Sequence, residues 1–205
     1  MNKIKNVIFD LGGVILNVKY ENVIQNFKNL GIKESFSFYN QKYQKEFFNL
    51  LETGKIDSIS FIKEMKKHCK SSEKEIIKAW NSIILDLPPE RVKILKDLSK
   101  NYNLFLLSNT NQIHINHIKK KIGKERYLDL YTTFNKVYYS HEIGLRKPDE
   151  EVFKFVINQE KIIPTETLFI DDSIQHTISA KKLGIKTYHL NNNEDIISLF
   201  PDIIL

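Results

Sequence analysis

Cysteine is nearly absent from this chain of 205 residues, in which Cys69 is the only one. A single cysteine excludes an intramolecular disulfide, and no spacing of Cys and His typical of a zinc site is present. Long apolar runs are also missing, since no stretch reaches the roughly 18 uninterrupted apolar residues of a transmembrane helix. The early apolar residues 7–9 and 14–16 are separated by Asp10 and two glycines, which argues against a signal peptide. We therefore expect a cytoplasmic protein with no membrane partner.

The remaining composition is that of a globular protein. Hydrophobic residues make up 41% of the chain, and the formal net charge is +6. A length of 205 residues corresponds to one domain, or to one domain with a large insertion. Such a chain buries about 70% of the surface of its unfolded form, so it needs neither a metal nor a disulfide to fold. The basic excess indicates an anionic partner, either a nucleic acid or a small phosphorylated molecule.

Short apolar segments alternate with helical patterns along most of the chain. Strands are predicted at residues 4–9, 104–107, 167–170 and 186–190, and each is followed by polar residues. Between them, apolar residues recur at helical spacing within 92–98, 152–156 and 174–183. This alternation predicts an α/β fold with a Rossmann-like parallel sheet flanked by helices. In such folds ligands bind at the carboxyl ends of the strands.

The segment from residue 20 to about residue 87 has a purely helical character. Apolar residues recur at helical spacing in four stretches, which begin at Tyr20, Tyr43, Phe61 and Ile76. We predict an α/β domain of residues 1–17 and 88–205 and a helical insertion of residues 18–87. Three aromatic side chains are expected to fill the core of the insertion rather than contact a substrate: Phe47, Phe48 and Trp80.

Acidic and polar side chains follow three of the predicted strands. Asp10 follows the first, Ser108 the second, and Asp171 with Asp172 the third. Neighbouring carboxylates repel one another, and a hard divalent cation such as Mg²⁺ relieves this repulsion. With Lys147 the set comprises carboxylates, a metal, a hydroxyl and a cation, which suits an anionic phosphoryl group. Each acidic residue alone is equally compatible with a simple capping role, but the ordered set favours the phosphoryl site.

These residues belong to four short motifs that resemble those of the haloacid dehalogenase superfamily. The motifs are FDLGGV at 9–14, LSNT at 107–110, KP at 147–148 and DD at 171–172. Their order matches the superfamily, and the resemblance spans residues 4 to about 190. The helical insertion resembles the helical cap that this superfamily places between its first two motifs. The combination is similar to a phosphatase subgroup that includes bacterial sugar-1-phosphate phosphatases and, more distantly, the amino-terminal phosphatase domain of soluble epoxide hydrolase.

The resemblance implies a nucleophile and a Mg²⁺ site. Asp10 would attack phosphorus to form an aspartyl-phosphate, and its other oxygen would bind the metal. The backbone carbonyl of Gly12 and the carboxylate of Asp172 would be further metal ligands. Asp171 would act either as a ligand through water or as an orienting partner.

The resemblance also implies a phosphoryl-binding set and a substrate class. Ser108 and the backbone at Asn109 would hold the phosphoryl oxygens, and Lys147 would bridge the phosphoryl group and the nucleophile. The substrate would be a small phosphorylated metabolite such as a sugar phosphate, selected by the cap. The polar turn at residues 51–57 either reaches toward the site or simply connects two helices.

One position departs from the usual superfamily pattern. Phosphatases of this type usually carry a second Asp two residues after the nucleophile, which protonates the leaving group, and here that residue is Gly12. General acid–base help is worth about 10²–10⁴-fold in rate. The subgroup resembled here also carries Gly at this position. His114 and His117 are candidates for a substitute acid or a metal-binding pair, or else they lie on an ordinary helix surface.

Other functions stay open at this point. The chain is alternatively a catalytically silent binding or regulatory protein that kept the fold. A 2-haloacid dehalogenase would use the same nucleophile, but it needs no Mg²⁺ and fits the paired Asp171 and Asp172 less well. Residues 119–121 are all lysines, yet they fall on a predicted helix surface, so no nucleic-acid partner is expected. The sequence leaves the oligomeric state open.

Overall fold

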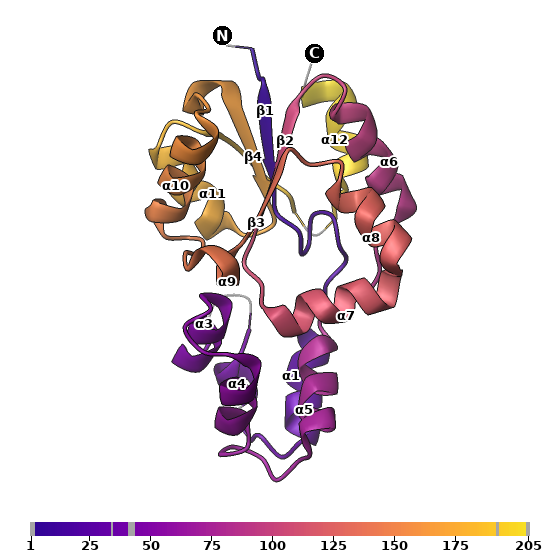
Figure 1. Cartoon of the computed structure of the whole chain (residues 1–205), viewed down its shortest axis with the longest axis vertical. Coiled ribbons are helices and arrows are strands. Elements are labelled where there is room, and N and C mark those ends of the chain that lie inside the picture. The colour runs from indigo at the N-terminus through magenta and orange to yellow at the C-terminus, as the bar shows by residue number, and fades with distance from the viewer. Residues whose placement is uncertain (1–2, 34, 41–43, 192, 204–205) are drawn as a thin grey trace.

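A parallel sheet of five strands lies at the centre of the structure, a computed structural model that describes residues 3–33, 35–40, 44–191 and 193–203 (Figure 1). The strands, in their order across the sheet, are β3 (Lys136–Tyr139), β2 (Asn103–Ser108), β1 (Asn6–Phe9), β4 (Thr167–Asp171) and β5 (Lys186–His189). In the central register Val7 lies between Leu104 and Leu168. All pairs are parallel, so the carboxyl ends of the strands meet at one edge. The predicted α/β fold with a parallel sheet is confirmed.

Helices cover both faces of the sheet (Figure 1). One face carries α10 (Glu150–Glu160) and α11 (Ile174–Lys182), and the other carries α6 (Pro89–Leu98), α8 (Lys124–Tyr131) and α12 (Ile196–Ile203). The helix α7 (Gln112–Ile122) runs across the lower end of the sheet domain, next to the helical insertion (Figure 1). Successive residues of β1 point to opposite faces, so Ile8 joins the core beneath α10 while Val7 and Phe9 join the core on the other side. All three side chains are fully buried, which explains why this strand is a continuous apolar run.

The sequence pattern does not predict the edge strand β3 or the helices α2 (Ser35–Phe38), α8, α9 (Ser140–Ile143) and α12. β3 has only four residues and its Lys136 is exposed, so it shows no clear period. Its position depends on distant contacts, since it pairs with β2 and the side chain of Asn135 just before it accepts a hydrogen bond from the backbone N–H of Leu104 (2.8 Å). Such pairing cannot be read from local sequence.

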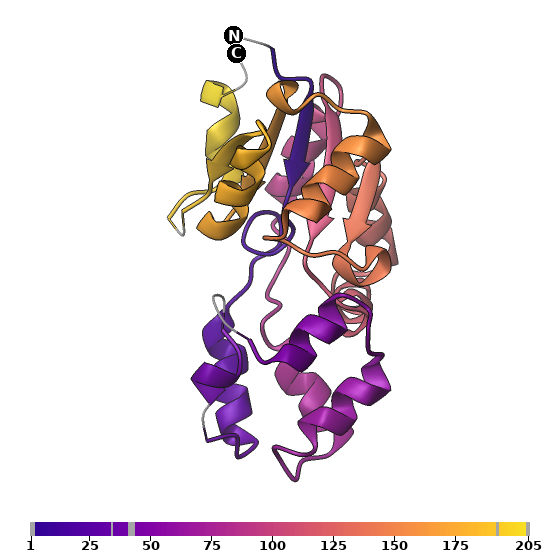
Figure 2. The same ribbon diagram turned by 90° about the vertical axis from the view of Figure 1, so that its left-hand side faces the viewer.

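The helical insertion lies below the carboxyl edge of the sheet (Figures 1 and 2). It consists of α1 (Tyr20–Asn29), α2, α3 (Glu46–Glu52), α4 (Ser58–Met65) and α5 (Glu73–Asn81). Phe48 and Trp80 are fully buried at its centre, where Phe27 stacks on Trp80 at 6.1 Å, and Phe47 packs beside them, as predicted. Tyr43 lies outside the described residues. The domain boundaries after residues 17 and 87 stay a prediction.

The two segments that connect the insertion to the sheet run side by side. The backbone N–H of Asn17 donates to the carbonyl of Asp86, and that of Lys19 donates to the carbonyl of Ile83, both at 2.9 Å. Between these bonds Val18 forms an antiparallel bridge with Ile84. The start of α1 is therefore held in a defined position close to the end of β1.

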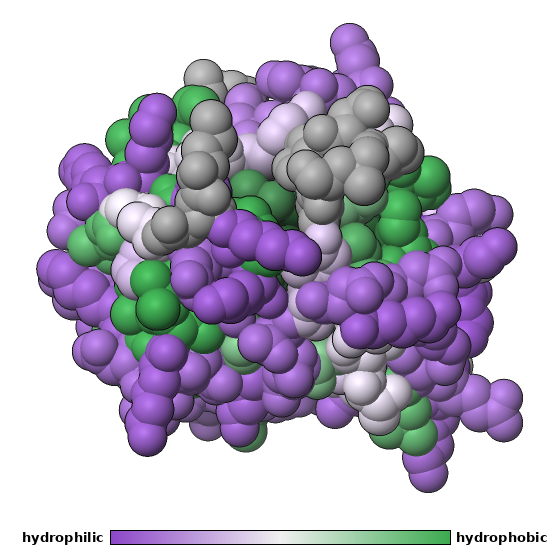
Figure 3. Space-filling model, turned by 90° about the horizontal axis from the view of Figure 1, so that it is seen from above, coloured by the Kyte–Doolittle hydropathy of each residue, from purple (hydrophilic) through white to green (hydrophobic). Residues whose placement is uncertain are grey.

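None of the described helices is long and apolar enough to cross a membrane. Figure 3 looks onto the end of the molecule opposite the insertion, and outside the grey atoms it shows a mostly hydrophilic face with separate hydrophobic spots. The three lysines at residues 119–121 are exposed on α7, in agreement with a solvated helix face.

Candidate active site

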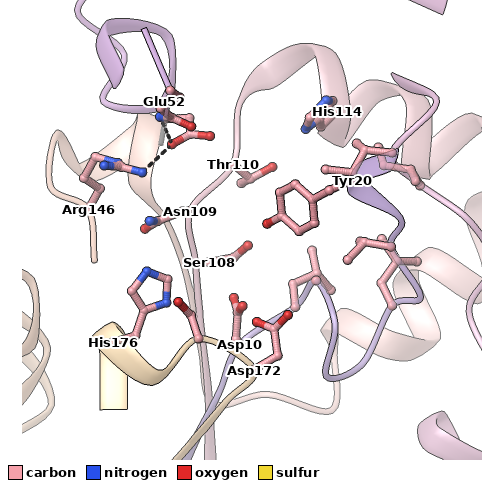
Figure 4. Close-up of a pocket in the computed structure, with 18 of the residues that line it drawn as sticks. Asp10, Tyr20, Glu52, Ser108, Asn109, Thr110, His114, Arg146, Asp172 and His176 are labelled. Carbon is pink, nitrogen blue, oxygen red and sulfur yellow. Dashed lines mark hydrogen bonds and ion pairs between the residues drawn. The ribbon is translucent and has the colours of Figure 1, made fainter. Parts of the chain in front are cut away.

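The carboxyl ends of three neighbouring strands bring the predicted acidic residues together (Figure 4). Asp10 directly follows β1, Ser108 ends β2 and Asp171 ends β4, with Asp172 next along the chain. Carboxylate oxygens of Asp10, Asp171 and Asp172 all lie within 4.8 Å of one another. Because β1 lies between β2 and β4, the hydroxyl of Ser108 approaches the cluster from the other side.

Lys147 lies at the centre of this cluster and is completely buried. Its Nζ is 2.8 Å from Oδ1 of Asp10 and 2.6 Å from Oδ2 of Asp171. Burial disfavours the ammonium charge, but the two carboxylates outweigh it and raise the pKa of Lys147. The lysine is therefore a permanent cation held beside the predicted nucleophile.

Asp171 is occupied on both oxygens by protein groups. Besides Lys147, the backbone N–H of Ser173 donates to Oδ1 (2.8 Å), and Nδ1 of His176 lies 2.9 Å from the same oxygen. Burial works to raise the pKa of Asp171, yet Lys147 and His176 lower it overall. These contacts fit the predicted orienting role better than direct metal ligation. Sequence patterns assign no role to His176, because its link to Asp171 depends on how α11 begins.

The negative charges of Asp10 and Asp172 are less well balanced by nearby positive groups than that of Asp171. Burial and the charges of Asp10 and Asp171 raise the pKa of Asp172 to about 8. Burial also raises the pKa of Asp10, although Lys147 opposes it. The three carboxylates offer oxygens within 4.8 Å of one another, and Lys147 forms ion pairs with only two of them; a hard divalent cation suits this donor set. The residues therefore fit Mg²⁺, and Gly12 lines the same pocket as Asp10 and Asp172.

Glycine is required at position 13 for a steric reason. Gly13 has a φ of +78°, and a Cβ placed on it would lie 2.3 Å from Oδ2 of Asp172. The absence of a side chain lets the first loop pass directly beneath this carboxylate. Gly13 thus allows the close approach of the first loop and the end of β4.

The predicted phosphoryl-binding residues lie on the wall of the same pocket, which includes Ser108 and Asn109. The side-chain amide of Asn109 makes two bonds to the backbone of Lys147, donating to its carbonyl (2.7 Å) and accepting from its N–H (2.9 Å). Asn109 therefore positions the lysine loop with its side chain. Ser108 is buried at the pocket floor.

The insertion forms the roof of the pocket (Figure 4). Glu52 at the end of α3 makes an ion pair with Arg146 of the sheet domain (2.9 Å), and both line the pocket together with Tyr20 and Tyr39. A Cβ on Gly54 would lie 2.2 Å from the carbonyl of His141, so the polar turn packs directly on the sheet domain. Of the two predicted alternatives, the turn at residues 51–57 therefore reaches toward the site.

His114 lines the pocket, but its ring is held by the protein. It stacks on Trp80 at 4.4 Å, with Nε2 3.2 Å from the Trp80 carbonyl and Nδ1 3.2 Å from the amide of Asn111. Burial lowers the pKa of His114 to about 3. His117 is half-buried on the same helix and does not line the pocket. The structure thus gives His114 a packing role and leaves His117 outside the pocket, which disfavours both an acid and a metal pair at these positions.

Comparisons with known proteins agree with this geometry. Residues 7–190 match the family described as haloacid dehalogenase-like hydrolase. A D-ribitol-5-phosphate phosphatase from Bacteroides thetaiotaomicron is 30% identical over 94% of both chains. A crystal structure of a HAD family enzyme from the same organism, a point mutant in complex with magnesium and inorganic phosphate, has a TM-score of 0.89 and 36% identity over 96% of this chain and 98% of that one. A HAD-like hydrolase from Porphyromonas gingivalis has a TM-score of 0.85 and 29% identity over 99% and 98%. The chain therefore belongs to the haloacid dehalogenase-like hydrolase family, as its four motifs indicate.

Proposed function

We propose that this protein is a Mg²⁺-dependent phosphatase that hydrolyses a small phosphorylated polyol or sugar, with Asp10 as the nucleophile. The observation that carries the proposal is the contact of Asp10 with the buried Lys147, next to a carboxylate cluster at the floor of a pocket. The relatives confirm the enzyme class and the Mg²⁺ cofactor that the motifs indicate. The geometry of the pocket supports the roles that we propose for individual residues.

In the first step the carboxylate of Asp10 attacks phosphorus. Lys147 holds one oxygen of Asp10, which orients the carboxylate and places a positive charge where the phosphoryl group is transferred. The hydroxyl of Ser108 and the backbone at Asn109 bind the phosphoryl oxygens from the side of β2. The leaving alcohol departs upward, into the space beneath the helical insertion.

The acidic residues prepare the site for this step. Asp171 keeps Lys147 charged and in place, since it contacts Nζ at 2.6 Å. Asp10, Asp172 and the carbonyl of Gly12 would hold Mg²⁺, which supplies positive charge to the phosphoryl oxygens when bound. In the second step a water molecule attacks the aspartyl-phosphate and releases phosphate. Asp10 returns to its starting state beside Lys147.

The pocket roof supports a polar leaving group. Glu52 and Arg146 place a carboxylate and a guanidinium in the wall, and Gln44 donates a hydrogen bond to Glu52 (3.0 Å). These groups suit the hydroxyls of a polyol or sugar, whereas an apolar leaving group would take water from this polar wall and offer it no hydrogen bond in return. The D-ribitol-5-phosphate phosphatase among the relatives supports ribitol 5-phosphate as the first substrate to test.

Phosphate release from ribitol 5-phosphate and from para-nitrophenyl phosphate tests the proposal, with Mg²⁺ or with EDTA. We expect turnover only with Mg²⁺, and none above background in Asp10→Asn. Asp97→Asn is the matched control, because this carboxylate is exposed on α6 away from the pocket. Activity that is equal in the wild type and Asp10→Asn, or equal with and without EDTA, would overturn the proposal.

A further inference from the structure

At position 12, where this family usually carries an acidic residue, the structure shows which side chain fills the space next to Gly12. A Cβ built on Gly12 would lie 3.3 Å from Cγ1 of Val18, so the side chain of Val18 already fills the direction in which a residue at position 12 would project. The segment that leads into α1 therefore covers Gly12. Any group that protonates the leaving oxygen has to come from another part of the pocket.

Tyr20 lies two residues beyond Val18 and borders the same pocket as Asp10 and Gly12. Its ring comes from the first residue of α1, and Figure 4 shows its hydroxyl pointing into the space above Asp10, Asp172 and Ser108. This is the side on which the leaving group departs.

The position of the phenol is defined by contacts on both sides. The hydrogen bond from Lys19 to Ile83 (2.9 Å) holds the backbone just before Tyr20, and its ring stacks on Tyr39 at 6.0 Å. Burial, followed by the charges of nearby groups that include Tyr39 and Asp172, raises the pKa of Tyr20 well above 10. The hydroxyl therefore keeps its proton throughout the neutral range.

The histidines and the Glu52–Arg146 pair of the pocket are bound to protein partners. Both ring nitrogens of His114 face protein groups, His176 contacts Asp171, and Glu52 is paired with Arg146. None of these three arrangements places a held proton above Asp10. Tyr20 combines a proton, a defined position and the correct side of the pocket.

We infer that Tyr20 takes over the general-acid role that Gly12 cannot fill, by donating its phenolic proton to the leaving oxygen of the substrate. The inference rests on the proposed phosphatase function. As the P–O bond breaks, its electron pair stays on the leaving oxygen, which takes the proton and departs as the alcohol. The phenolate then regains a proton from solvent, and the proton released by the water that hydrolyses the aspartyl-phosphate returns to solvent. One water is consumed per cycle, and Tyr20 ends as it began.

Leaving-group dependence tests this role. Tyr20→Phe keeps the ring that packs on Tyr39 and removes only the hydroxyl. We expect kcat for ribitol 5-phosphate to fall at least about 10²-fold and kcat for para-nitrophenyl phosphate, whose leaving group needs no proton, to stay within about threefold. Phenyl phosphate should lie between them. Tyr39→Phe is the matched control and should change all three esters by a similar factor.

Three outcomes decide whether Tyr20 is the general acid, and they can be told apart from a failure of the proposed phosphatase function. A steeper dependence on leaving-group basicity in Tyr20→Phe supports the role, and retained para-nitrophenyl phosphatase activity shows that the variant is folded. An equal loss for all esters, or no loss, overturns it. If the wild type hydrolyses aryl phosphates with Mg²⁺ but not ribitol 5-phosphate, the proposed substrate is wrong, while the slope of the aryl series still decides the role of Tyr20.

Discussion

Acidification is expected to destabilise the protein through His114. The side chain is buried between α7 and the insertion, where it stacks on Trp80 at 4.4 Å. Burial lowers its pKa from 6.5 to about 3. The unfolded chain therefore takes up a proton below pH 6.5, while the folded protein excludes it until the pH approaches 3.

The sign and size of the effect follow from this difference. A depressed pKa contributes stability that is present above pH 6.5 and is lost as the pH falls toward the folded pKa. Each pH unit between the two values is worth about 1.4 kcal/mol, so a change from about pH 7.5 to about pH 5 costs about 2 kcal/mol through this side chain. That is a large part of the roughly 5–15 kcal/mol by which most domains are stable.

Urea unfolding in EDTA, followed by circular dichroism at both pH values, measures this loss. His114→Gln removes the titrating ring, so its free energy of unfolding should fall by about 2 kcal/mol less than that of the wild type on acidification. His117→Gln, on the same helix but half-buried, should keep most of the wild-type dependence. Equal losses in the wild type and His114→Gln would refute the reasoning.

Three further substitutions and one exchange of charges probe the site. Gly13→Ala would place a Cβ 2.3 Å from Oδ2 of Asp172 and should weaken Mg²⁺ binding, measured by calorimetry, at least about tenfold. Arg146→Met leaves Glu52 buried without its cation and should lower the free energy of unfolding by about 2 kcal/mol, less than for a fully buried pair because Arg146 is 23% exposed. The exchange of Glu52 and Arg146 should recover part of that loss in urea unfolding. Lys147→Met should reduce phosphate release from both test esters at least about 10³-fold, because the two carboxylates it contacts lose their shared cation.

Local sequence was sufficient for four of the five strands and for the floor of the site. The run at β1 is buried on both faces, so its apolar character is continuous and ends sharply at Asp10. Polar residues after buried strands must gather at one sheet edge, because parallel strands end on the same side. This is why Asp10, Ser108, Asp171 and Asp172 were predicted as one cluster. The short edge strand β3 was not predicted, because its pairing with β2 joins residues that are distant in the sequence.

Only the tertiary structure determined the roof of the pocket and the partners of the acidic residues. Glu52 and Arg146 are 94 residues apart and meet because the insertion folds back over the sheet. Tyr20 resembles any apolar residue of a helical stripe, and its place above Asp10 depends on the paired connecting segments. The sequence by itself determined which residues end the strands, because burial of a strand leaves a local pattern. Which groups face those strand ends depends on packing between elements that are distant in the sequence. Such packing leaves no local pattern in the sequence.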